Sequence, residues 1–192
     1  MKTEHPLPRT DKQLLHALSV PQRQGDYPRD SRAFVRIDSS LRVYWHTLFD
    51  ICPGLLELSG PDGLAIFRPF MSWAAQQRLS LNWTYYLWLD VWLQHSAFAR
   101  QVTPALRYQL MGASAARWAT GDRSEANGIF LAAADLPDLV CGWKTQTLEG
   151  ARDIEQIELA EPLPAPEAAF GYFTVHSRHL QDGFPGWTDV PR

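Results

Sequence analysis

One segment of the chain, residues 81–100, is apolar on nearly every side when it is drawn as a helix. Ten consecutive residues of this segment, 83–92, contain three tryptophans and two tyrosines. Asp90 is the one charged residue of the segment before Arg100. A soluble helix that is apolar all round normally lies at the centre of a bundle. Aromatic residues also favour strands, but the length of the segment and its polar end, 94–100, favour a helix. The sequence therefore predicts a domain built around a buried helix.

Helical patterns also occur on both sides of this segment. Apolar residues recur at helical spacing over 41–52, and a second helix is expected to begin near Pro61-Asp62. Thr103-Pro104 is a typical helix start, with a side-chain cap followed by proline in the first turn. A further helix is expected over 124–134, and residues 138–147 are expected to form a short helix or an irregular segment. Most of the chain thus reads as helical.

The predicted fold is mainly α: an antiparallel helical bundle with a small β element contributed by the N- and C-terminal segments. The β-branched and aromatic segment 33–37 and the segment 170–176 are the expected strands. Three parts are expected along the chain: an N-terminal arm at 1–32, a helical domain at 33–148, and an acidic, proline-rich tail at 149–192.

Composition excludes several classes of protein. The chain of 192 residues has a net charge of -3, so the basic excess typical of nucleic-acid binders is missing and no nucleic-acid partner is expected. No apolar run is long enough to cross a bilayer, and the first residues do not resemble a secretory signal. The two cysteines, Cys52 and Cys141, are expected to be reduced thiols in the cytoplasm. Only three of the 18 basic residues are lysines, which is typical of a GC-rich bacterial genome.

Catalytic and metal-binding motifs are absent from the sequence. It has no glycine-rich phosphate loop and no H-E-x-x-H zinc motif, so no catalytic residue, metal site or cofactor is predicted. Histidines supply the alternative. His176 and His179 form an H-x-x-H pair, and His46 stands four residues before Asp50. These residues leave open a small enzyme or ligand-binding domain with a histidine-containing site beside an aromatic pocket.

Aromatic residues are the most unusual part of the composition, with eight tryptophans. Tryptophan and tyrosine are common anchors at protein interfaces. The predicted binding residues are Trp187, Phe184, Trp143 and Tyr172. For Trp187, in a tail rich in glycine and proline, two roles stay open: an exposed anchor, or a staple that holds the tail to the domain.

Together these observations predict a non-enzymatic protein that binds another protein. It would be an adaptor, an accessory subunit or an immunity-type inhibitor, docking through aromatic anchors and the acidic, proline-rich tail. Because residues 149–167 carry six acidic residues and one arginine, the expected partner has a basic surface. Assembly with further copies of the same chain is a second form of partnership that the sequence leaves open.

Overall fold

The computed structural model describes residues 17–177 and 183–192. The chain forms two compact units, residues 1–77 and 78–192. The predicted N-terminal arm lies outside the described residues up to position 16. In the described part of the first unit, the elements are the 3₁₀ helix η1 (Pro21–Asp26) and the α-helices α2 (Arg32–Phe49), α3 (Gly54–Ser59) and α4 (Leu64–Gln76).

Helix α2 begins earlier than its sequence pattern indicates. The Ser31 hydroxyl caps it by accepting a hydrogen bond from the Phe34 amide at 3.1 Å. The segment 33–37, expected as a strand, is the first part of this helix. Ile37 and Leu41 are buried at helical spacing, and this tertiary packing outweighs the strand preference of Val35 and Ile37.

Turns between the helices of the first unit are fixed by specific hydrogen bonds. The Trp45 indole N–H donates to the backbone oxygen of Asp62 at 2.8 Å, and the Asp62 side chain accepts from the Leu64 amide at 3.0 Å. Helix α4 therefore begins beside α2, close to the predicted position. It contains Pro69 and continues to Gln76.

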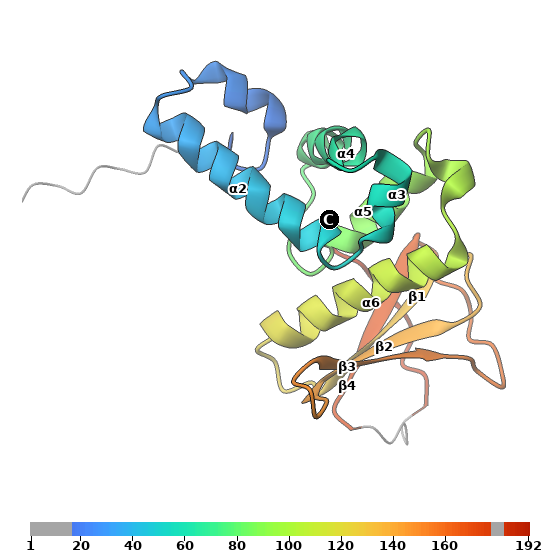
Figure 1. Cartoon of the computed structure of the whole chain (residues 1–192). Helices are drawn as coiled ribbons and strands as arrows, with labels where there is room; N and C mark the ends of the chain where they lie inside the picture. The colour runs from blue at the N-terminus through green and yellow to red at the C-terminus, as the bar shows by residue number, and fades with distance from the viewer. Residues whose placement is uncertain (1–16, 178–182) are drawn as a thin grey trace, which may run out of the picture. The chain divides into compact units, whose positions relative to one another are not determined.

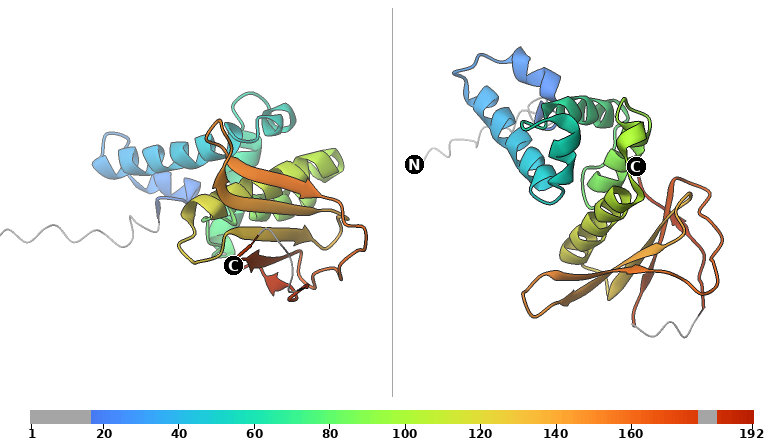
Figure 2. Two further views of the ribbon diagram at one scale, coloured as in Figure 1. Left: turned by 90° about the horizontal axis from the view of Figure 1, so that it is seen from below. Right: turned by 45° about the vertical axis from the view of Figure 1, so that its right-hand side comes forward.

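The second unit is a sheet with helices on one face. Helices α5 (Tyr85–Gln94) and α6 (Pro104–Gly121) come first, separated by the 3₁₀ helix η2 (Ala99–Gln101). Thr103 caps α6 as its sequence predicts, accepting from the Leu106 amide at 3.2 Å. Helix α6 lies across the sheet and α5 packs against α6 (Figures 1 and 2). The segment expected as a helix over 81–100 is thus a buried helix only over 85–94, because the chain turns after Gln94, and its neighbours include a sheet.

Five antiparallel strands form the sheet, in the order β3-β2-β1-β4-β5. The mainly α prediction, with an antiparallel helical bundle, is therefore wrong. The N-terminal segment adds no strand among the residues described, whereas β4 falls within the segment 170–176. The strands, in chain order, are β1 (Gly128–Ala133), β2 (Leu139–Gln146), β3 (Arg152–Ile157), β4 (Phe170–Val175) and β5 (Thr188–Asp189).

Strands β1 and β2 replace the helix expected at 124–134 and the short helix or irregular segment expected at 138–147. The misleading feature is that β1 is buried at every position and so lacks the apolar–polar alternation of a strand with one wet face. Its alternate residues serve two separate cores. Ile129 and Leu131 face α6, and Phe130 and Ala132 face the opposite side.

Helix α6 approaches the sheet most closely at Gly142 of β2. A Cβ atom at this position would lie 2.7 Å from the Cβ of Ala115 on α6. Small residues on both elements thus let the helix backbone lie on the strand. The side of the sheet that faces α6 is called the inner face below, and the other side is called the outer face.

A buried ionic network ties α5 and α6 to the loop after β1. Asp90 has no exposed surface and contacts the Nε of Arg107 through both carboxylate oxygens, at 3.1 and 3.2 Å. The two terminal nitrogens of Arg107 bind the carboxylate of Asp135, each at 2.7 Å. A bidentate arginine pair of this kind fixes both distance and orientation. The one charge in the middle of the aromatic helix is therefore compensated.

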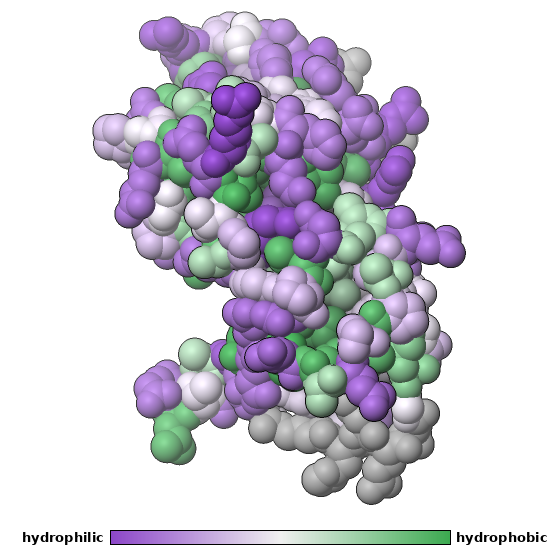
Figure 3. Space-filling model, turned by 90° about the vertical axis from the view of Figure 1, so that its right-hand side faces the viewer, coloured by the Kyte–Doolittle hydropathy of each residue, from purple (hydrophilic) through white to green (hydrophobic). Residues whose placement is uncertain are grey.

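Most large apolar side chains are buried. On the face shown in Figure 3, hydrophobic side chains emerge in small groups between hydrophilic ones. Leu148, on the turn after β2, is fully exposed. In the part of the chain that the structure describes, no helix has the length and hydropathy needed to cross a membrane.

Candidate functional site

The outer face of the sheet carries a cluster of aromatic side chains. Phe130 of β1 stacks on its register partner Phe173 of β4, with ring centroids 5.0 Å apart and planes 5° apart. The Trp143 ring on β2 meets Phe130 edge-on at 5.9 Å. All three side chains point to the same side of the sheet. Phe130 and Phe173 are register partners, and Trp143 pairs with Gly128, which shares a face with Phe130 because alternate residues of a strand point the same way. They form the floor of the candidate site.

Two segments far apart in sequence border this floor. The first is the proline strap, residues 159–166, which follows β3, and the second is the segment 183–187. Trp187 joins them, because its indole N–H donates to the backbone oxygen of Pro164 at 2.5 Å. The Trp187 ring also contacts Phe173 and Phe184, with centroids 5.3 and 5.0 Å away. An antiparallel sheet commonly leaves one face to water, but here these segments cover part of it.

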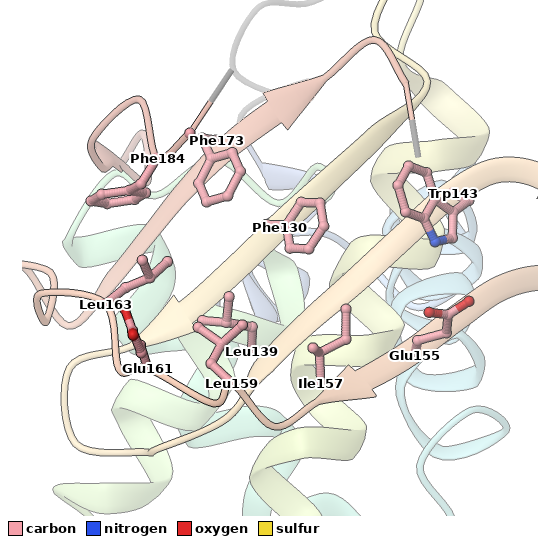
Figure 4. A pocket seen from close by; sticks show the side chains of 11 residues that line it. Phe130, Leu139, Trp143, Glu155, Ile157, Leu159, Glu161, Leu163, Phe173 and Phe184 are labelled. Carbon is pink, nitrogen blue, oxygen red and sulfur yellow. The ribbon is translucent and has the colours of Figure 1, made fainter. Parts of the chain in front are cut away.

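Between the floor and its borders lies a pocket of about 410 Å³ (Figure 4). Phe130, Leu139, Trp143 and Phe173 line it from the sheet, and Phe184 lines it from the C-terminal side. Protein cores contain few voids larger than a water molecule. This volume falls within the range of small-ligand pockets, roughly 300–1,000 Å³. The pocket is therefore large enough to hold a small apolar group.

One wall of the pocket comes from a single stretch of chain. Glu155 and Ile157 of β3, followed by Leu159, Glu161 and Leu163, all line the pocket. These are alternate residues, so the period of two that begins in the strand continues into the proline strap. Two carboxylates and three aliphatic side chains thus face the same space. Both glutamates are exposed to solvent.

The sequence of this unit, together with most of the first, matches a known family. Residues 24–191 match the family model described as methanobactin biosynthesis cassette protein MbnC-like. The chain belongs to the MbnC-like family. Membership makes it a protein associated with a biosynthesis cassette. A search of curated proteins finds no match.

The four binding residues predicted for this MbnC-like chain divide between the two faces of the sheet. Trp143 and Phe184 line the pocket. Trp187 lies beside it and fastens the proline strap, which is the staple role left open by the sequence. Tyr172 lies on the inner face, where its ring meets Trp83 edge-on at 5.4 Å. Tyr172 is therefore outside the site.

Several lining residues of the MbnC-like chain were missed in the sequence. Phe130 lies in a segment expected as a helix, so its place on a strand face went unseen. The alternation from Glu155 to Leu163 was visible, but it crosses from a strand into a run of prolines. The useful signal is that Leu159 and Leu163 keep to the period of two beyond the end of the strand, with Glu161 between them.

The histidines do not form a site among the described residues. His46 Nδ1 lies 3.2 Å from Asp50 on the exposed surface of α2. His176 Nδ1 lies 3.3 Å from the backbone oxygen of Glu125, and His179 lies outside the described residues. Residues 17–177 and 183–192 contain no group of three or more His, Cys, Asp or Glu side chains placed to hold a metal ion.

Proposed function

We propose that this MbnC-like chain is a non-enzymatic accessory protein of methanobactin biosynthesis that binds another protein of the cassette. The binding surface is the pocket on the outer face, with the proline strap as its border. The observation that carries the proposal is the preformed pocket of about 410 Å³ above a floor of aromatic rings. Fully desolvated aromatic anchors supply most of the binding energy in protein interfaces.

The surroundings of the pocket support binding rather than catalysis. Its polar lining groups are the carboxylates of Glu155 and Glu161, and the remaining lining residues are apolar apart from Gly183. A pair of catalytic carboxylates either flanks one reacting bond, as in glycosidases, or lies close enough to share a proton. Here they stand at opposite ends of the pocket, beside Trp143 and Leu163 (Figure 4). The pocket therefore suits an inserted side chain better than a reacting group.

We also place the protein in the bacterial cytoplasm. Cys52 and Cys141 are both buried free thiols, which is typical of a reducing compartment. Burial raises the pKa of the Cys52 thiol to about 12, so it is a poor nucleophile. Both cysteines therefore behave as small apolar core residues.

Substitution of the pocket border tests the proposal. The tagged chain is expressed together with the other proteins of the cassette, and the proteins that purify with it are identified. We expect one cassette protein to purify with the wild-type chain, and to be lost with Leu163→Asp or Leu159→Asp. Leu148→Asp is the matched control, because Leu148 is exposed and does not line the pocket.

Circular dichroism and thermal unfolding verify that each variant is folded. The proposal is wrong if both folded pocket variants retain the cassette protein at the wild-type ratio. A second copy of this chain as the occupant would give another result. The wild-type chain alone would then sediment as a dimer, and Leu163→Asp would dissociate it.

A further inference from the structure

The pocket combines an apolar interior with charges of one sign. Glu155 lies at one end beside Trp143, and Glu161 lies at the other end beside Leu163 (Figure 4). Ile157 and Leu159 stand between them on the same wall. The order along the wall is therefore acidic, apolar, apolar, acidic.

The stretch of chain that forms this wall adds no positive charge. The stretch from Asp153 to Ser177 contains five acidic residues and neither lysine nor arginine. Fixed charges of one sign around a cleft with low-dielectric walls raise the local concentration of oppositely charged groups. The field at the pocket thus attracts cations.

The nearest basic residues of the sheet are already engaged. Lys144 Nζ forms an ion pair with Asp122 at 2.7 Å and lies over the Trp118 ring. Arg152 donates to Thr120 of α6 at 3.2 Å and to the backbone oxygen of Lys144. Their hydrogen bonds direct both side chains towards α6 and the loop after it. Neither side chain lines the pocket.

Resting on the proposed function, we infer that the pocket recognises a partner segment in which a large apolar side chain is flanked by lysine or arginine. The apolar side chain fills the space above Phe130 and Phe173, and the cations meet Glu155 and Glu161. Exposed ion pairs add little affinity each, but they select the partner and accelerate its association. The two glutamates therefore determine specificity, and the aromatic floor supplies affinity.

Three small molecules of one shape test this charge preference directly. The probes are 4-phenylbutylamine, 4-phenylbutan-1-ol and 4-phenylbutanoate, which share a phenyl group on a four-carbon chain and end in a cation, a neutral hydroxyl and an anion. Each is titrated into the full ¹⁵N-labelled chain, and the indole N–H signal of Trp143, assigned with Trp143→Phe, reports binding. We expect the amine to bind most tightly and the carboxylate most weakly.

Variants identify the groups responsible. In the double variant Glu155→Gln/Glu161→Gln, the amine should bind about fivefold more weakly, while the affinity for the alcohol stays unchanged. Glu158→Gln is the matched control, since Glu158 is an exposed acid of the same segment that does not line the pocket. High salt should remove the same advantage of the amine, because exposed charges are screened.

The outcomes separate this inference from the proposal on which it rests. Equal affinity for the amine and the alcohol in the wild-type chain overturns the recognition of a cation but leaves the apolar pocket intact. A preference for the amine that survives in the double variant overturns the role of Glu155 and Glu161. If none of the three probes shifts the Trp143 signal, the pocket itself is no receptor, and both ideas fail.

Discussion

The indole of Trp143 lies directly against Gly128, its register partner across strands β1 and β2. A Cβ atom at position 128 would lie 2.5 Å from the Trp143 ring, which is closer than any real contact of this kind. The ring that forms one end of the pocket floor therefore occupies the space that a side chain would take. Glycine at this strand position is a requirement of the site rather than of the backbone.

Gly128→Ala should consequently displace the Trp143 ring. We expect a loss of about 1–3 kcal/mol in the free energy of unfolding, measured in urea, because the added methyl overpacks a filled space. Binding of the phenyl probes should weaken as well. Gly121→Ala is the control, because nothing lies within 4 Å of a Cβ there and alanine is the better helix former. An unchanged stability in Gly128→Ala would show that the ring moves freely.

The hydrogen bond from Trp187 to Pro164 is expected to hold the proline strap in place. In Trp187→Phe the ring contacts with Phe173 and Phe184 remain, but the hydrogen bond to Pro164 is lost. We expect a cost of about 1 kcal/mol and faster amide hydrogen exchange over residues 159–166. Mass spectrometry of peptides from this region measures the exchange. Exchange at the wild-type rate would mean that the proline strap is held by other contacts.

Among the charged residues, Arg107 is expected to contribute most to the free energy of unfolding. Its replacement in Arg107→Ala leaves the fully buried Asp90 without its cation, which should cost about 3–5 kcal/mol of unfolding free energy. Arg107→Lys should recover little of this stability, because lysine lacks the planar guanidinium group that reaches both Asp90 and Asp135. Arg42→Ala, which removes an exposed ion pair with Asp38, should cost roughly 0.5 kcal/mol or less. Similar losses in the two alanine variants would contradict this account.

Stability should also depend on Asp135 in acid. Hydrogen bonds from Arg107 hold the pKa of Asp135 below its ordinary value. Since the folded pKa is the lower one, the stabilisation is complete above the unfolded pKa of about 3.9 and is lost as the pH falls through the folded pKa. In urea unfolding at pH 6, the wild-type chain should therefore have a higher free energy of unfolding than Asp135→Asn. This difference should shrink below about pH 4. A constant difference would exclude this contribution.

Elements fixed by local interactions could be predicted from the sequence, whereas a strand buried on both faces could not. Thr103-Pro104 predicted the start of α6 because its capping hydrogen bond is local. The pattern of segment 81–100, apolar on all sides, predicted a buried helix, which the structure has over 85–94. The same reasoning failed for β1, where Ile129 and Phe130 are both buried but in different cores. Periodicity records burial on one face, so it cannot assign a strand that is buried on two.

The site shows a similar division between local and distant effects. Trp143, Phe184 and Trp187 were predicted as binding residues from their residue type, and all three lie in or beside the pocket. Phe130 and Phe173 were not predicted, because their stacking depends on the register between β1 and β4. Register is set by long-range pairing, which a single sequence does not display.

The most direct test of the central claim is to locate the bound partner on the chain. Amide hydrogen exchange is compared for the free chain and for its complex with the cassette protein that purifies with it. The account predicts slower exchange over residues 155–163 and 183–187, with the same peptides unprotected in Leu163→Asp under identical conditions. Protection confined to other segments, with 155–163 unchanged, would contradict the assignment of the outer face as the binding surface.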